Sequence, residues 1–291
     1  MGTSTPFGGS PGRSPLIPSW LPDGTGAGLA PGVPSPAPMP PGAPAPAVPP
    51  APPPRPVPKP GDADRFRVPR SNLTRFASSG GADRRSMGRA VSGYVSGTAG
   101  GARQAAQRMG PSRGVGAGLI NFLNAVHVDG ARAALRTLNL ESLAGRPIEE
   151  IFSGLADYIC PEGGTIDEGI AREAFAETIA DLADAGITDI DQLTAGQIET
   201  VFELYATHAI EARLYNDIGN KLVTVPASSQ AAERVQTQLR EFIQRGVSDA
   251  LHASAVRIQA LRHSQVMTFV TDMYQAAFEV LRALGDAEAE A

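Results

Sequence analysis

The distribution of proline limits what this chain can fold into more than any other feature. Twenty-one of its 26 prolines lie within residues 1–60, although the chain has 291 residues. Each proline ring holds φ at about −65° and removes a backbone donor, so such a segment cannot build helices or sheet ladders. Residues 31–60 have no periodic apolar face, and we expect an extended spacer on the order of 90 Å long. Any folded core must therefore come from the residues that follow.

Charge divides the chain a second time. Residues 55–113 contain twelve Lys or Arg against three Asp, a net charge of +9. Residues 114–291 contain twelve basic and 26 acidic residues, a net charge of −14, so the overall value of −5 conceals two regions of opposite sign. Together with the prolines, this pattern predicts four segments. They are a flexible N-terminal tail with a docking segment (1–30), a Pro-rich linker (31–64), a basic Gly-rich helical collar (65–114) and an acidic all-α helical domain (115–291).

The compartment follows from cysteine usage and from the lack of targeting patterns. One cysteine, Cys160, allows no internal disulfide and suits a reducing environment. The chain has neither a secretion signal nor a stretch of about 18 apolar residues. We therefore expect a cytoplasmic protein that does not enter a membrane.

Helical patterns begin in the collar. Met87, Val91 and Tyr94 recur at the spacing of one helical stripe, but Gly88 and Gly93 each cost about 1 kcal/mol relative to alanine. This helix is predicted to be marginal unless it packs against a partner surface. The glycine-rich run at 110–118 lacks the Lys of a phosphate-binding loop, and we interpret it as a flexible joint and a helix N-terminus.

The acidic region shows stronger helix boundaries. Pro147 is expected at the first position of a helix whose apolar face is Ile148, Ile151, Phe152, Leu155, Tyr158 and Ile159. Capping boxes are predicted at residues 165–168 and 194–197. Gly246 and Ser248 indicate a joint before a last helix that ends near residue 284. Only residues 221–225 resemble a strand, so the fold class is an all-α helical body preceded by a long disordered Gly/Pro-rich N-terminal tail.

Side chains able to carry chemistry are sparse. The histidines lie on separate segments without the spacing of zinc ligands, so no metal, cofactor or catalytic residue is predicted, and His208 is expected at a helix surface or boundary. Cys160 is expected to be a buried structural residue. A stripe of carboxylates has two interpretations, a solvated face or a surface that meets basic groups such as the collar. It consists of Glu173, Glu177, Asp181 and Asp184.

The arginines of the collar also have two interpretations. Clustered arginine neutralises phosphates without reading a base sequence, but few aromatic residues are present for stacking on bases. The alternative is contact with a partner protein or with the acidic region. The candidate contact residues are Arg65, Arg67, Arg70, Arg75, Arg84, Arg85 and Arg89.

The first twenty residues pair an unhindered N-terminus with an apolar cluster. Removal of the initiator methionine would expose the α-amine of Gly2, and Pro6 occupies the position where myristoylation requires Ser or Thr. Leu16, Ile17 and Trp20 have the character of anchors that dock in a partner's groove. The alternative is a disordered tail in which the tryptophan is incidental.

These residues carry a family resemblance. The opening MGTST, the runs GGSPG and SPLIPSW, and the collar sequence RSNLTRFASSGGADRRSMGRAVSGYVSGTAGGARQAAQRMG resemble the QatB family of the bacterial Qat anti-phage defence system. The resemblance implies three partners: an ATPase (QatA), a QueC-like enzyme (QatC) and a TatD-like nuclease (QatD). It also implies that this chain is the member without an enzymatic fold.

The resemblance further implies a mechanism. QueC-type enzymes activate a 7-deazaguanine carboxylate with ATP and deliver it to a nitrogen nucleophile, and the α-amine of Gly2 is such a nucleophile. Thr3 and Ser4 would then hydrogen-bond at the mouth of the partner's active site. Two alternatives remain open: a scaffold that joins the ATPase and the nuclease, or a sensor of nucleic acid that uses the collar.

Overall fold

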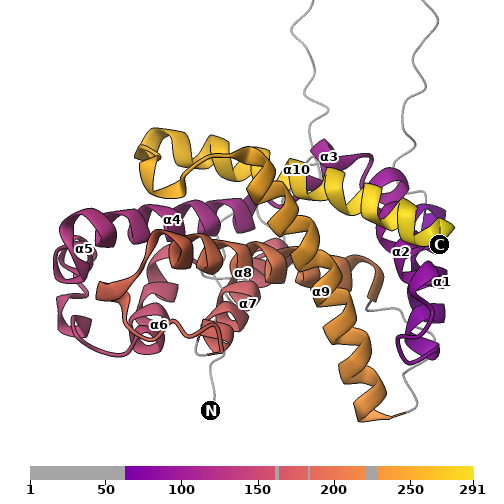
Figure 1. Cartoon of the computed structure of the whole chain (residues 1–291), viewed down its shortest axis with the longest axis horizontal. Helices are drawn as coiled ribbons and strands as arrows, with labels where there is room; N and C mark the ends of the chain where they lie inside the picture. Colours follow the sequence, from indigo (N-terminus) through magenta and orange to yellow (C-terminus); the bar gives the residue numbers. More distant parts are fainter. Residues whose placement is uncertain (1–62, 161–163, 183, 220–227) are drawn as a thin grey trace, which may run out of the picture. The chain divides into compact units, whose positions relative to one another are not determined.

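The computed structural model describes residues 63–160, 164–182, 184–219 and 228–291, and these ranges contain helices and no β-strand (Figure 1). The all-α prediction is therefore confirmed. The predicted tail, most of the linker and the strand-like residues 221–225 lie outside the described residues. The α-helices are α1 (Arg67–Ser78), α2 (Arg84–Gly93), α3 (Ala102–Arg108), α4 (Gly110–Asp129), α5 (Ala131–Thr137), α6 (Ile148–Ile159), α7 (Ile166–Leu182), α8 (Ala195–Leu214), α9 (Ser229–Ser254) and α10 (His263–Glu290).

Short helical turns link several of these elements. Two of them are π-helical, η2 (Tyr94–Thr98) directly after α2 and η5 (Tyr215–Gly219) directly after α8. The others are 3₁₀ turns: η1 (Ala63–Phe66), η3 (Glu141–Leu143), η4 (Ile190–Gln192) and η6 (Ile258–Ala260).

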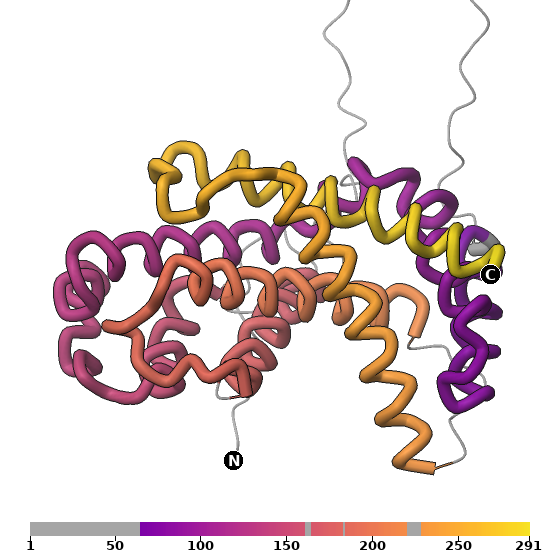
Figure 2. Tube along the Cα trace, viewed as in Figure 1, coloured from indigo at the N-terminus to yellow at the C-terminus, as the bar shows by residue number. Residues whose placement is uncertain are grey.

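The last helix packs against early helices of the described chain. α10 packs most extensively against α2 and α9 and also touches α3 and α4, and Figures 1 and 2 show α2 and α10 side by side. Met87 and Tyr94 from the collar lie in one hydrophobic core with Phe278 and Leu281 from α10. The marginal collar helix thus has its partner surface within the same chain, which offsets its poor intrinsic propensity.

Both predicted capping boxes are present. Thr165 Oγ1 accepts from the Glu168 amide (3.2 Å), and Glu168 Oε2 accepts from the Thr165 amide (2.9 Å). Thr194 and Gln197 make the same reciprocal pair at the start of α8. Pro147, however, is the residue before the first helical position of α6. Local boundary patterns therefore located these helix starts to within one residue.

The predicted joint at residues 246–248 is wrong. α9 continues through Gly246 to Ser254, and the chain turns instead at Ala255, whose φ is +51°. A Cβ on Gly246 would lie 2.6 Å from Leu281 Cδ2, so this glycine admits a side chain of α10 into the helix interface. A glycine inside a helix can mark close packing as well as a helix end.

The glycine-rich run at 110–118 is likewise no flexible joint. α4 begins at Gly110, as the helix N-terminus interpretation expected, and continues without a break to Asp129. Gly116 lies against the rings of Phe202 and Tyr205. The predicted face of α6 holds for Ile148, Ile151, Phe152 and Leu155, which are buried, but Tyr158 is 49% exposed.

Candidate functional site

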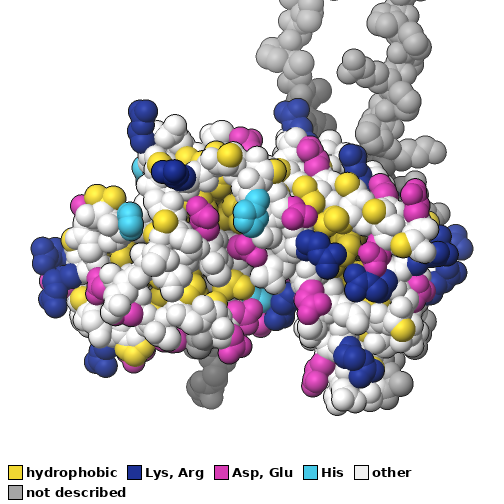
Figure 3. Space-filling view, in the orientation of Figure 1, with side chains coloured by type: hydrophobic (Ala, Val, Ile, Leu, Met, Phe, Trp, Pro, Cys, Tyr) yellow, Lys and Arg dark blue, Asp and Glu magenta, His cyan; other side chains and the backbone are white. Residues whose placement is uncertain are grey.

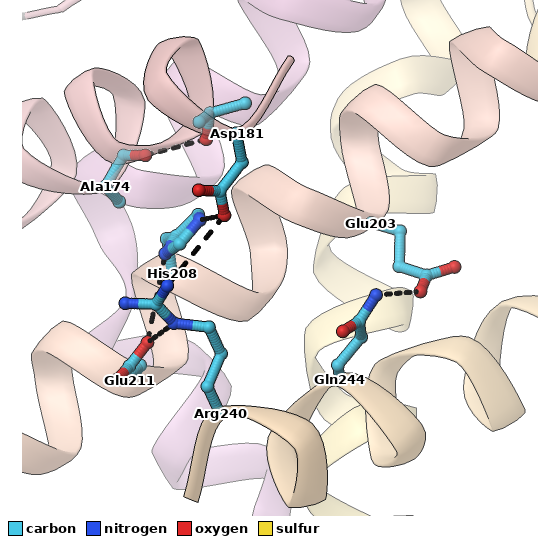
Figure 4. Close-up of polar contacts among 8 residues, drawn as sticks. Ala174, Asp181, Glu203, His208, Glu211, Arg240 and Gln244 are labelled. Atoms are coloured by element: carbon cyan, nitrogen blue, oxygen red, sulfur yellow. Dashed lines mark hydrogen bonds and ion pairs between the residues drawn. The ribbon is translucent and has the colours of Figure 1, made fainter. Parts of the chain in front are cut away.

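Four charged or titratable side chains from three helices meet between α7, α8 and α9 (Figure 4). His208 and Glu211 lie three residues apart on one face of α8, Asp181 comes from the end of α7, and Arg240 comes from α9. His208 Nε2 lies 2.8 Å from Asp181 Oδ2, and Arg240 Nε donates to Glu211 Oε2 at 2.8 Å. Arg240 Nη1 also lies 3.9 Å from Asp181 Oδ2, so the four residues form one cluster.

Burial sets the electrostatics of this cluster. The side chains of His208 and Glu211 are 2% and 6% exposed. Desolvation raises the pKa of Glu211, although Arg240 and His208 oppose the rise. Desolvation works against the charge of Arg240, but Glu211, Asp181 and Glu177 outweigh it and raise the pKa of Arg240. Only one oxygen of Glu211 is satisfied, because Oε1 is buried and has no hydrogen-bond partner in the described part of the chain.

A cavity of about 640 Å³ opens beside the cluster. His208, Glu211 and Arg240 form part of its wall, and apolar side chains from α7 and α9 form another part. Tyr215, at the start of η5, also lines the cavity; its burial and the nearby Glu211 raise its pKa to about 12. The cavity is large enough for a small organic molecule and combines an apolar wall with a few convergent polar groups.

These contacts correct the expectation for His208, which is buried instead of lying at a surface or boundary. They also divide the carboxylate stripe. Asp181 faces Arg240 and His208, whereas Glu173 and Glu177 are exposed and line the cavity. Within the described residues, Asp181 therefore has its basic partner on α9 and not in the collar.

A second buried network ties the collar to the rest of the core. The Tyr94 hydroxyl donates to Asp217 Oδ2 (2.8 Å), which joins the two π-helical turns. Arg70 Nη2 donates to the Asp217 carbonyl (3.0 Å). Arg213 pairs with Asp167 at 2.8 Å, and both side chains are at most 3% exposed. Burial and Asp217 raise the pKa of Tyr94, so its hydroxyl remains a donor. We assign this network to structure.

The seven candidate arginines of the collar have different surroundings. Arg65 and Arg70 lie over the ring of Phe66, and Arg84 forms an ion pair with Glu288 of α10. The exposed members are Arg67, Arg75, Arg84, Arg85 and Arg89, and of these Arg84 is the one that pairs with Glu288. In the face shown in Figure 3, basic and acidic side chains lie beside each other over the end formed by α1, α2 and α10. The arginines therefore do not form an unbroken basic surface on this face.

The predicted acceptor and docking residues lie outside the described part of the chain. They are Gly2, Thr3, Ser4, Leu16, Ile17 and Trp20. Cys160 is 4% exposed, as expected of a buried cysteine, and burial raises its pKa to about 11. Within the described ranges, no group of three His, Cys, Asp or Glu side chains is placed to hold a metal ion. Nor does any helix in those ranges have the length and apolarity to span a membrane.

The sequence pattern did not predict the cluster as a site. The spacing of His208 and Glu211 was visible, but nothing near residue 240 indicates that its arginine reaches them. Arg240 lies 29 residues from Glu211 on another helix, and only the packing of α9 against α8 brings the two together.

Comparison with protein-family models gives a match over most of the helical region. Residues 100–281 match the model of a family described as "Qat anti-phage system associated protein QatB", a range that exceeds half of the chain and contains the whole cluster. Neither a curated protein nor a solved structure matches the chain.

Proposed function

The chain belongs to the QatB family of Qat anti-phage system proteins, and on that premise we propose that it serves its system as a modified acceptor and not as a catalyst. In this proposal, a QueC-like partner enzyme joins a 7-deazaguanine carboxylate, activated with ATP, to the α-amine of Gly2. The amine nitrogen attacks the activated carboxyl carbon, the bond from that carbon to the oxygen of the ATP-derived phosphate group breaks, and the phosphate group leaves while the nitrogen loses a proton to give the amide. Thr3 and Ser4 hydrogen-bond at the mouth of the partner's site, while Leu16, Ile17 and Trp20 dock nearby.

The observation that carries this proposal is the family match, which places the chain among the components of a Qat system and implies other Qat components as partners. We propose that these are the QueC-like enzyme (QatC), the ATPase (QatA) and the TatD-like nuclease (QatD). The one cysteine of the chain is a buried thiol of raised pKa, and a protonated thiol is a poor nucleophile, so Cys160 is a poor rival to the Gly2 amine as the acceptor.

The test is the intact mass and the N-terminal peptide map of the full chain, expressed alone and together with the QueC-like enzyme. An added mass on Gly2 only in the second sample supports the proposal. Gly2→Leu should retain the initiator methionine and lose the added mass, whereas Gly9→Leu leaves the terminal glycine intact and serves as the matched control. An unmodified Gly2 in both samples, with a stable complex recovered, overturns the proposal.

A scaffold is the second candidate, and the exposed arginines of α1 and α2 favour it because they offer a surface to a partner. In a scaffold, deletion of residues 2–30 leaves both the complex and the defence intact. In a modified acceptor, the same deletion leaves the complex intact and abolishes the defence. Binding of the collar to DNA with a steep salt dependence would instead favour nucleic-acid sensing.

A further inference from the structure

We infer that the cavity between α7, α8 and α9 is a binding site for an organic cation, a compound with a protonated nitrogen donor and an apolar body. This inference goes beyond the proposed modification of Gly2 and does not depend on it. Its basis is an incomplete hydrogen-bond arrangement at the wall of the cavity.

The incomplete group is Glu211. Its side chain is 6% exposed, Arg240 holds Oε2, and Oε1 has no partner in the described residues. A buried carboxylate oxygen without a donor is costly, and the terminal torsion of glutamate is broad. Because Glu211 lines the cavity, rotation about this torsion can turn Oε1 toward it. A donor in the cavity would complete the arrangement and stabilise the charged carboxylate.

The charges around the cavity select the sign of the ligand. Its lining includes three carboxylates, those of Glu173, Glu177 and Glu211. Among the described lining residues, the basic side chains are Arg240 and the titratable His208. The guanidinium of Arg240 is already engaged by Glu211 and Asp181. An anion would therefore meet three carboxylates without a cation free to bind it, whereas a cation would meet complementary charge.

The other wall selects an apolar body. Ile170 and Val235 are buried and line the cavity, and Ile166 lines it while 36% exposed. The ring of Tyr215 offers a surface for a flat group or for a cation–π contact. The volume of about 640 Å³ exceeds what one ammonium or guanidinium group fills, so the ligand brings further atoms with its charge.

The test uses benzamidine, a planar cation with an apolar body, titrated into the full chain and followed by calorimetry. Benzamide, its neutral analogue, is the ligand control. We expect saturable binding of benzamidine, with Glu211→Gln weakening it by about tenfold or more, as loss of a charge-assisted hydrogen bond predicts. Glu203→Gln is the matched control, because Glu203 lies on the same helix and contacts Gln244 away from the cluster (Figure 4).

A second variant keeps the test decisive if Glu211→Gln fails to fold. Glu177 is exposed and lines the cavity, so Glu177→Gln should weaken the binding of benzamidine several-fold without shifting the midpoint of urea denaturation. Three results overturn the inference: no saturable binding up to about 10 mM, equal affinities for benzamidine and benzamide, or equal affinities of the Glu177→Gln and Glu203→Gln variants.

An organic cation of this kind can come from two natural sources, a small metabolite or a basic side chain of another protein. Agmatine represents the first source and a blocked tripeptide with one central arginine represents the second. Tighter binding of agmatine assigns the site to a metabolite, and tighter binding of the peptide assigns it to a protein side chain. Failure of both to compete with benzamidine overturns the inference.

Discussion

Gly88 of α2 and Gly285 of α10 face each other where the two helices cross. A Cβ on Gly88 would lie 2.6 Å from the Gly285 carbonyl oxygen, and a Cβ on Gly285 would lie 2.7 Å from the Gly88 carbonyl oxygen. Neither glycine has a positive φ, so each is required for its missing side chain. This contact lets α2 approach the last helix closely enough to bury Met87 and Tyr94 completely.

Substitution at this crossing should destabilise the protein. Gly88→Ala gains helix propensity but places a methyl group against backbone atoms, and we expect a net loss of about 1–3 kcal/mol in the free energy of unfolding. Urea denaturation measures this change. Gly114→Ala is the control, since a Cβ on that helical glycine would meet nothing within 4 Å, and it should gain about 0.5–1 kcal/mol. A Gly88→Ala variant as stable as the natural chain would contradict this account.

The buried ion pair of the second network should matter far more than pairs at the surface. Asp167→Ala leaves Arg213 buried without the carboxylate that it contacts at 2.8 Å, and we expect a loss of about 3–5 kcal/mol. Asp157→Ala removes the exposed partner of Arg172 and should cost no more than about 1 kcal/mol. Urea denaturation of both variants under the same condition compares their free energies of unfolding. Similar losses for the two variants would refute the assignment of the Asp167–Arg213 pair to the structural network.

Glu211 should make stability depend on pH. Its pKa in the folded state lies above the ordinary value of 4.5, so its contribution is fully present below that pH and is lost as pH rises through the folded pKa. The natural chain should therefore lose stability relative to Glu211→Gln as pH rises from 4.5 toward neutrality. Unfolding free energies across this range test the sign, with Glu203→Gln as the control. A difference that stays constant with pH, or that favours the natural chain at high pH, would be inconsistent with burial of an ionised carboxylate.

Cys160 should react slowly while the protein is folded. Burial raises the pKa of its thiol from 9.0 to about 11, which lowers the thiolate fraction at pH 8 by about 100-fold. Its contribution to stability is present below pH 9.0 and is lost as pH rises toward about 11. The rates of labelling by iodoacetamide at pH 8, measured in the native state and in urea, give the ratio of thiol reactivity in the two states. Comparable rates in the two states would show that the thiol is accessible and ionised.

Part of the candidate site was predictable from local patterns. The carboxylate stripe allows two interpretations, a solvated face or a surface that meets basic groups such as the collar. The structure shows that Asp181 of the stripe meets Arg240 of α9. His208 was expected at a surface or boundary because a single helical stripe does not reveal how many neighbours surround it. The packing of α9 over α8 buries it.

Local sequence was sufficient for the properties that depend on neighbouring residues. Capping boxes join residues three apart, and apolar stripes and proline content act within a few turns, so helix starts and the all-α class followed from local chemistry. Tertiary packing alone explains why Gly88, Gly246 and Gly285 are glycines and which charges meet at Glu211. These features depend on contacts between residues far apart in the chain, and their energies arise from burial and close approach, which no local pattern records.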